Sequence, residues 1–207
     1  MGNIEVTEGA KYQPDANGFL KQVDPKPFEY DLTYKGNQAT NTFMSGVRLG
    51  WLLAFVGYDK IKNYQAVDVG AGNGTFVKEL KPVFKKIVPY DLCGETISDE
   101  ELYGTEWDVV FFYDTLEHYK EIDAFWDLKF KYAIISFPET PEGFDLTKWK
   151  HRKPNEHLYL LKLREVIKWV EKHGYRVVAS GCPEDAIRRR WDDALPNIST
   201  ILILKKL

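Results

Sequence analysis

One segment of the sequence has the pattern of a strand, a tight turn and a helix start: Ala66-Val67-Asp68-Val69-Gly70-Ala71-Gly72-Asn73-Gly74-Thr75-Phe76. Its first residues are apolar and β-branched, which favours a strand, and Asp68 lies inside that run. The three alternating glycines allow positive φ and leave no Cβ in the way of a ligand. A helix that begins near Phe76 would direct its unpaired N–H groups and its positive dipole end at the turn. The segment therefore predicts a site for a small molecule with an anionic group or a carboxylate.

The spacing of these glycines indicates which ligand is bound. A dinucleotide-binding turn has the pattern G-x-G-x-x-G. This chain has G-x-G-x-G and places Thr75 where that pattern needs its third glycine. With the preceding acid, the turn resembles the S-adenosylmethionine (SAM) loop of class I methyltransferases. The resemblance implies SAM as the cofactor and cofactor contacts from Asp68, Gly70, Ala71, Gly72 and Gly74. The alternative is a glycine-rich turn that serves only packing.

Composition and charge limit the kind of protein. The 207 residues are 44% hydrophobic and 29% charged, which is ordinary for one soluble globular domain. A net charge of -3 gives no general attraction to nucleic acid or to membrane surfaces. Cys93 and Cys182 make neither a disulfide framework nor a zinc pattern, and no apolar run is long enough to cross a bilayer. We expect a cytoplasmic protein with a small-molecule partner, no membrane association and no nucleic-acid partner.

Two further acids follow predicted strands. The apolar run 86–92 contains Asp91, about 20 residues beyond the glycine turn, where related folds bind a ribose diol. The run 107–113 leads into Asp114-Thr115-Leu116-Glu117-His118, which resembles the fourth-strand segment of small-molecule SAM methyltransferases with a Leu-Glu-His motif. The carboxyl ends of parallel strands form one crevice. The resemblance implies that Asp91 and its neighbour Leu92 contact the cofactor and that Asp114 lies beneath the sulfonium.

Over residues 40–207 the order of the predicted elements resembles a class I, Rossmann-like methyltransferase. We expect an α/β fold with a mostly parallel twisted sheet, helices on both faces and an antiparallel last strand. Residues 93–106 leave too little room for both the helix and the third strand that are usual in this fold. We therefore expect the third strand to be short or missing, which leaves the adenine contacts unassigned.

The N-terminal part of the chain differs in composition from the rest. Residues 1–38 contain many prolines and glycines and little periodicity, which predicts an arm or lid, while residues 39–207 form the single methyltransferase domain. Many small-molecule methyltransferases carry an aromatic N-terminal segment that closes over SAM. That resemblance implies a cofactor contact from Tyr34, and packing of the arm onto the core is the alternative.

Two helices are predicted by periodicity and capping. One is expected to begin near Thr40 or Asn41, either of which can cap it. Residues at helical spacing predict its buried face: Phe43, Val47, Trp51, Ala54 and Phe55. Arg48, on the same helix, is expected to be solvated or paired at the surface. The second helix is expected to open at Glu117 and His118 and to continue through Ile122, Phe125 and Trp126.

Two histidines are candidate catalytic residues. Methyl transfer from SAM is an in-line displacement, so the enzyme mainly aligns donor and acceptor and excludes water. A hydroxyl or ammonium acceptor also needs a base, and His118 and His157 are the candidates because histidine titrates near neutral pH. The segment 138–158 is too long for a plain connection and is predicted to be the acceptor lid. Structural, hydrogen-bonded histidines are the alternative.

The sequence leaves more than one reaction open. We expect methyl transfer to a small molecule, with a hydroxyl as the favoured acceptor group. Asp114-x-x-Glu117-His118 with His157 also has the residue types of a divalent-metal site and resembles metal-assisted 2′-O-methyltransferases acting on RNA or a diol. Because Leu-Glu-His is common in metal-free relatives and the net charge does not favour RNA, we assign no metal ligand. A non-catalytic SAM-binding protein is the third interpretation, since function does not follow from fold.

Overall fold

The computed structural model describes residues 4–5, 10–29, 38–92, 96–149, 151–188 and 199–207. Tyr34, the predicted lid aromatic, lies outside the described residues. Among the helices of the described residues, none combines the length and the apolar character needed to cross a membrane.

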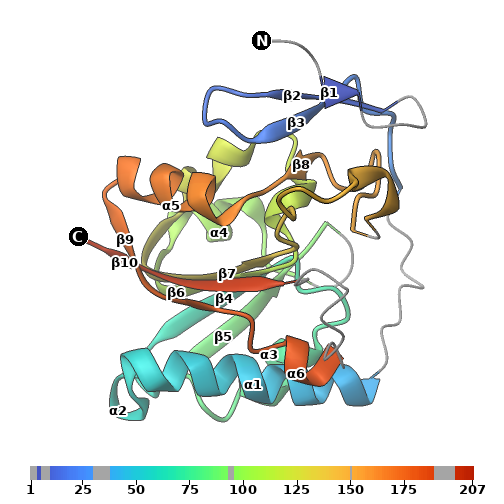
Figure 1. Cartoon of the computed structure of the whole chain (residues 1–207). Coiled ribbons are helices and arrows are strands. Elements are labelled where there is room, and N and C mark those ends of the chain that lie inside the picture. Colours follow the sequence, from blue (N-terminus) through green and yellow to red (C-terminus); the bar gives the residue numbers. More distant parts are fainter. Residues whose placement is uncertain (1–3, 6–9, 30–37, 93–95, 150, 189–198) are drawn as a thin grey trace.

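A six-stranded sheet forms the centre of the molecule (Figure 1). In spatial order its strands are β5 (Lys86–Tyr90), β4 (Gln65–Val69), β6 (Glu106–Tyr113), β7 (Lys129–Phe137), β10 (Thr200–Lys206) and β9 (Tyr175–Gly181). Strand β4 is parallel to β5 and β6, and β6 is parallel to β7. Strand β10 is antiparallel to both of its neighbours, β7 and β9. The predicted mostly parallel sheet with an antiparallel last strand is confirmed.

The predicted loss of the third strand is also confirmed for the described residues. Between β5 and β6 they contain one regular element, the short helix α4 (Asp99–Gly104). Its N-cap is Ser98, whose side chain accepts a hydrogen bond from the backbone N–H of Glu101. The chain then returns directly to β6, so β5 is the edge of the sheet.

Helices cover both faces of the sheet, and alternating residues of each strand contact them. One face packs against α1 (Gln38–Val56), α2 (Tyr58–Ile61) and α3 (Thr75–Leu80) through Ala66, Val109 and Phe111. The other packs against α4 and α5 (Leu163–Lys172) through Val67, Val110 and Phe112. Figure 1 shows α1 and α3 on the side of the sheet opposite α5, with α6 (Asp185–Arg188) beside α1. Strands buried on both faces explain the nearly continuous apolar runs in the sequence.

The buried face of α1 differs from the prediction. Phe43 and Phe55 are 66% and 50% exposed, and Ala54 is exposed as well. Met44, Leu52 and Val56 are buried; Leu52 and Val56 pack onto the sheet, and the predicted Trp51 packs, partly buried, against the same cluster. The prediction was wrong for Phe43, Ala54 and Phe55 because apolar residues surround most of this helix, so periodicity alone did not single out one side.

The helix predicted through residues 117–126 was wrong. The chain instead forms two 3₁₀ turns, η1 (Leu116–His118) and η2 (Ile122–Asp127). The hydroxyl of Tyr159 accepts a hydrogen bond from the Ile122 N–H and donates one to the Lys120 carbonyl. These bonds satisfy backbone groups between the two turns that a continuous α-helix would have paired internally.

A second, smaller sheet lies above α5 and the loop before it (Figure 1). Its antiparallel strands are β1 (Ile4–Glu5), β2 (Lys11–Pro14), β3 (Leu20–Val23) and β8 (Tyr159–Leu160). The N-terminal segment thus contains a hairpin that the sequence analysis did not foresee. Its turn is held by the Asp15 carboxylate, which accepts from the N–H groups of Asn17 and Phe19.

The segment 138–158 packs against this hairpin. It contains one short 3₁₀ turn, η3 (Leu146–Lys148), followed by Trp149, which is 6% exposed. Trp149 joins Ala10, Tyr12 and Leu160 in a small apolar cluster. The hairpin and the segment 138–158 therefore form one layer over the end of the central sheet.

Candidate functional site

The glycine turn joins β4 to α3 at the carboxyl end of β4. Gly70, Gly72 and Gly74 all have positive φ (78°, 55° and 70°). The N–H groups of Gly70 and Ala71 both donate to the carbonyl of Tyr90, at the end of β5. The turn is therefore fixed to the neighbouring strand by main-chain hydrogen bonds.

Gly70 cannot be replaced by a residue with a side chain without strain. Its φ of 78° is rare for L-residues, and a Cβ there would collide with the side chain of Thr115. The Thr115 hydroxyl donates to the carbonyl of Val69. The glycine turn and the segment that follows β6 are thus in direct contact.

Asp91 lies one residue beyond the end of β5 and bonds to the glycine turn. Its Oδ2 accepts a hydrogen bond from the backbone N–H of Gly72, with an N–O distance of 2.8 Å. A carboxylate is the kind of group that accepts hydrogen bonds from both hydroxyls of a ribose. The next residue, Leu92, is 80% exposed. An exposed leucine beside the acid offers an apolar surface to a flat ring.

Asp114 follows β6 with φ of 51°, a left-handed conformation that Asp tolerates better than most residues. Its Oδ1 accepts hydrogen bonds from the hydroxyls of Ser136 (3.1 Å) and Ser199 (2.8 Å). Its N–H donates to the Ser136 carbonyl. Three chain segments therefore hold this carboxylate at the carboxyl end of β6.

Asp68 lies on the face of β4 that packs against α1 and is 3% exposed. Burial raises the pKa of Asp68 to about 7; the positive charge of Arg48 opposes this shift, and the negative charge of Asp91 adds to it. A carboxyl group with this pKa is partly protonated at neutral pH. A bound ammonium group would favour its charged form.

Arg48 is largely buried, with 13% of its side chain exposed, rather than solvated or paired at the surface, so the prediction for it was wrong. Its Nε donates to the carboxylate of Glu184, which is fully buried just before α6. Its guanidinium carbon lies 3.8 Å from the centre of the Tyr113 ring. The ion pair and the ring contact hold this cation in the layer between α1 and the sheet.

His118 and His157 lie together beside Glu117. The two imidazole rings are 4.7 Å apart, centre to centre, and nearly perpendicular. Nδ1 of His118 donates to the carbonyl of Glu156 at 3.0 Å, so the lone pair is on Nε2. That Nε2 lies 3.9 Å from Oε1 of Glu117. We call Glu117, His118 and His157 the His–Glu cluster.

Burial controls the charge of this cluster. Glu117 is 1% exposed and His157 5% exposed, while the side chain of His118 is 19% exposed. Burial lowers the pKa of His157 to about 3, with further lowering by the charges of His118 and Lys153. Burial also lowers the pKa of His118, although Glu156 opposes the shift. Both imidazoles are therefore neutral near pH 7, with a lone pair on each ring.

Comparison with known proteins assigns the chain to a family. A family model described as a methyltransferase domain matches residues 49–180, which include the glycine turn, both strand-end acids and the His–Glu cluster. This chain belongs to the methyltransferase-domain family. No curated protein matches its sequence.

Solved methyltransferase structures share the fold of this methyltransferase. The magnesium protoporphyrin IX methyltransferase of Synechocystis PCC 6803, with bound S-adenosylhomocysteine (SAH), is 15% identical over 88% of this chain and 90% of its own, with a TM-score of 0.54. A SAM-dependent methyltransferase from Archaeoglobus fulgidus is 18% identical over 83% and 95%, with a TM-score of 0.55. The 1,6-didemethyltoxoflavin-N1-methyltransferase of Burkholderia thailandensis is 13% identical over 100% and 99%, with a TM-score of 0.51. Family and fold confirm the expectation of a SAM-dependent methyltransferase.

The structure brings together most of the residues that the sequence predicted for this methyltransferase. Asp68, the glycine turn, Asp91 and Asp114 lie at the carboxyl ends of three adjacent parallel strands. Sequence reasoning missed Arg48 and Glu184 as partners at this end of the sheet. A signal for Arg48 was present, because it lies at four-residue spacing between the buried Met44 and Leu52.

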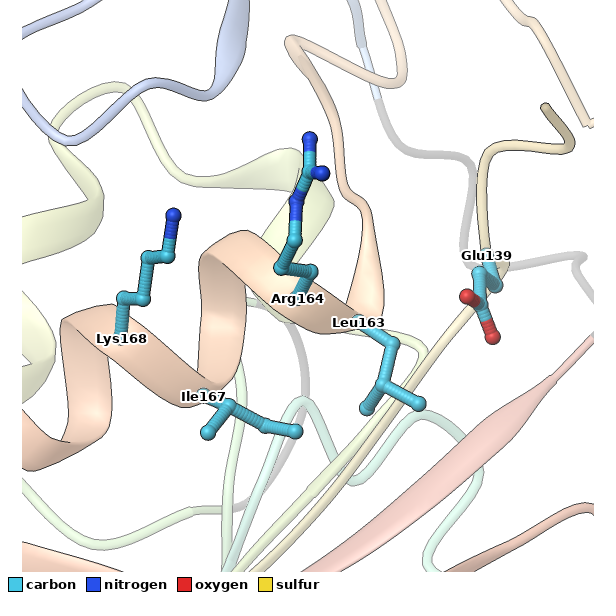
Figure 2. A pocket seen from close by; sticks show the side chains of 5 residues that line it. All are labelled: Glu139, Leu163, Arg164, Ile167 and Lys168. Atoms are coloured by element: carbon cyan, nitrogen blue, oxygen red, sulfur yellow. The ribbon is translucent and has the colours of Figure 1, made fainter.

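A surface hollow of this methyltransferase does not coincide with these residues. It has a volume of about 440 Å³ and lies against α5, lined by Glu139, Leu163, Arg164, Ile167 and Lys168. Figure 2 shows Arg164 and Lys168 pointing away from Leu163 and Ile167. No residue of the glycine turn or of the His–Glu cluster lines this hollow. The hollow is therefore not assigned as the cofactor site.

Proposed function

We propose that this methyltransferase transfers a methyl group from SAM to a hydroxyl of a small molecule. The methionine end of SAM lies on the glycine turn, Gly70 to Gly74, with its ammonium group near Asp68. Asp91 accepts hydrogen bonds from the ribose, Leu92 and Tyr34 contact the nucleoside, and Asp114 lies beneath the sulfonium. The positions of three carboxylates at three adjacent strand ends support this placement.

The His–Glu cluster supports a hydroxyl as the acceptor group, and the hydrogen bond between Nδ1 of His118 and the Glu156 carbonyl is the observation that carries the proposal. Its Nδ1–H is engaged by the Glu156 carbonyl, so its neutral Nε2 presents a lone pair four residues beyond Asp114. An amine acceptor that is already neutral needs no such group, whereas a hydroxyl must lose its proton. The hydroxyl oxygen attacks the methyl carbon, the C–S bond breaks, and its electron pair stays on sulfur to give SAH. Nε2 of His118 accepts the hydroxyl proton.

A small molecule is favoured over nucleic acid as the acceptor. The net charge is -3, which opposes binding to a polyanion. The segment 138–158 and the N-terminal hairpin lie over the end of the sheet, where they would enclose an acceptor and exclude water. The similar structures named above include enzymes of magnesium protoporphyrin IX and of didemethyltoxoflavin, which are small molecules.

Two measurements test this function separately. Calorimetry with SAH should show one binding site, which Gly72→Val and Asp91→Ala weaken by about tenfold or more because each removes a turn or ribose contact. Asp59→Ala, at an exposed side chain on α2, is the matched control and should bind SAH like the wild type. No binding of SAH by the wild-type protein would contradict the assignment of the cofactor site.

The acceptor is tested with SAM labelled in its methyl group. The protein is incubated with a panel of small phenols, sugars and quinols, and the labelled products are identified. We expect label on oxygen. Label found on nitrogen, carbon or sulfur of the acceptors would overturn the hydroxyl assignment without affecting the cofactor site.

A further inference from the structure

The His–Glu cluster has the geometry of a metal-ion site. Glu117, His118 and His157 each offer one donor atom, and these atoms lie within 4.8 Å of one another. Among the described residues, this is the one group of three or more His, Cys, Asp or Glu side chains with such an arrangement. Two of the residues come from η1 and the third from the segment just before β8, so the tertiary fold assembles the group.

Backbone hydrogen bonds hold both histidines in orientations suited to metal binding. The Glu156 carbonyl takes the Nδ1 proton of His118, which leaves Nε2 as a donor atom beside Glu117. His157 bonds to the backbone of His151 through its ring. Histidine ligands of metal ions commonly donate their second ring N–H to a carbonyl in this way, because it fixes the tautomer and the ring orientation.

The two chain segments are also fastened to each other. The Leu158 N–H donates to the Glu117 carbonyl at 2.7 Å, and the Tyr12 hydroxyl donates to the His157 carbonyl at 3.3 Å. The hairpin therefore supports the segment that carries His157. The donor atoms are held near one another by main-chain contacts and do not depend on flexible surface loops.

The charges of the cluster suit a cation. Its carboxylate is 1% exposed and His157 is 5% exposed, so a carboxylate oxygen and an imidazole are held together out of contact with bulk water. Lys153, the nearby cation, is engaged by Glu156 with an N–O distance of 2.9 Å. A buried carboxylate is stabilised most by a positive charge placed directly on it.

We propose that Glu117, His118 and His157 bind one divalent transition-metal ion. Two imidazoles and one carboxylate are a ligand set for Mn²⁺, Fe²⁺, Co²⁺ or Zn²⁺, whereas Mg²⁺ prefers oxygen ligands. Two ligands on one ion lie at most about 4.2 Å apart, twice a bond of about 2.1 Å. The three side chains therefore close slightly on binding. Asp114, which the sequence pattern included, is outside this ligand set because its carboxylate bonds to Ser136 and Ser199.

A catalytic role for the ion rests on the proposed function. The binding of the ion is argued from the geometry of the cluster alone. A hydroxyl that reaches such an ion loses its proton more readily, because the positive charge stabilises the alkoxide. With the ion bound, the ion replaces His118 in activating the hydroxyl, because the Nε2 lone pair of His118 then binds the ion; the proton goes to solvent on the exposed side of His118. Three protein ligands leave coordination positions for two oxygens, which points to acceptors with adjacent hydroxyls.

Calorimetry with CoCl₂ tests the site directly. The full chain is stripped with EDTA, exchanged into metal-free buffer and titrated with CoCl₂. We expect one ion per chain, and binding weaker by about tenfold or more in Glu117→Gln, His118→Gln and His157→Gln. The matched controls are His173→Gln, on the cap of α5, and Glu171→Gln, on its exposed face, which should bind Co²⁺ like the wild type.

Thermal unfolding provides a second measure of Co²⁺ binding, and SAH binding shows whether each variant is correctly folded. With CoCl₂ at about 100 times the wild-type Kd, the Tm of the wild type should rise by about 5–10 °C, and that of Glu117→Gln should rise by about half as much or less. Each variant must also bind SAH. Wild-type protein that binds SAH but no Co²⁺, or Co²⁺ binding unchanged in all three cluster variants, would overturn the metal site while leaving the proposed function intact. Co²⁺ binding with the expected variant pattern but no methyl transfer to hydroxyls would support the site and refute the function.

Discussion

The cofactor side of the site is built from residues close to the main chain of three adjacent strands, whereas the His–Glu cluster joins side chains about 40 residues apart. Gly70, Ala71 and Gly72 are fixed by hydrogen bonds to the end of β5 and to Asp91. Glu117 and His157 meet because the segment before β8 crosses over η1. The first arrangement is set by local backbone geometry and the second by tertiary packing. Changes on the two sides should therefore have separable effects, on SAM affinity in one case and on the acceptor or metal in the other.

The largest expected effect on the cofactor side is that of Arg48→Met. The change leaves the fully buried carboxylate of Glu184 without the cation that faces it. We expect a loss of about 3–5 kcal/mol in the free energy of unfolding, measured with urea. Arg164→Met, at an arginine on α5 whose side chain is 68% exposed, is the control and should cost less than about 1 kcal/mol. Equal losses in the two variants would show that the buried pair is not a structural element of the cofactor side.

Gly70→Ala tests the contact between the glycine turn and the segment after β6. A methyl group at this position combines a positive φ with a clash against Thr115, and we expect a loss of about 2–4 kcal/mol. SAH affinity should fall as well. Gly104→Ala, where a Cβ would meet nothing within 4 Å, should change stability by less than about 0.5 kcal/mol. If Gly70→Ala kept full SAH affinity, the turn would not be the cofactor site.

Asp68→Asn removes the ionisable carboxyl group of Asp68 and keeps the shape of the side chain. Because burial raises the pKa of Asp68 to about 7, the folded state binds more protons than the unfolded state between about pH 4 and 7. Wild-type stability therefore falls as pH rises through this window and becomes level above it. The variant lacks this decline. The free energy of unfolding of Asp68→Asn minus that of the wild type, measured with urea, should therefore be about 2–3 kcal/mol greater at pH 8 than at pH 5. A constant difference at the two pH values would contradict the raised pKa.

Tyr12→Phe should have the smallest effect and should act only on the acceptor side. It removes the hydrogen bond to the His157 carbonyl and should cost about 1 kcal/mol of stability. Tyr175→Phe is the matched control, since it also loses a hydroxyl bond to a buried carbonyl, that of Phe130. SAH affinity should be unchanged in both, and Co²⁺ affinity should fall in Tyr12→Phe alone. A fall in SAH affinity in Tyr12→Phe would show that the two sides are coupled.

The sequence predicted the positions of the glycine turn and of the two strand-end acids in the fold well because its signals are local. The strand, turn and helix around Gly70 to Gly74 are contiguous, and Asp91 and Asp114 directly follow apolar runs. The missing third strand followed from a count of the residues between two such runs. In each case the physical cause of the structure lies within a few residues of the pattern that predicts it.

The remaining features depend on contacts between distant segments. Arg48 is buried because Glu184 reaches it from the other end of the chain, and nothing beside Arg48 in the sequence indicates that partner. The turns η1 and η2 replace one predicted helix because the Tyr159 hydroxyl bonds to the backbone between them. The N-terminal hairpin is completed by β8, more than 130 residues away. Such pairings cannot be read from periodicity within one segment.

The carboxylate of Glu184 and the hydroxyl of Ser199 have a consequence for how the protein is made. Glu184 lies 136 residues after Arg48, to which it bonds, and Ser199 lies 85 residues after Asp114, to which it bonds. A nascent chain whose synthesis has passed the glycine turn and both strand-end acids still lacks these two supports. We therefore expect a chain that stops before Glu184 to bind SAH more weakly than the full chain, because Arg48 and Asp114 both lose these contacts.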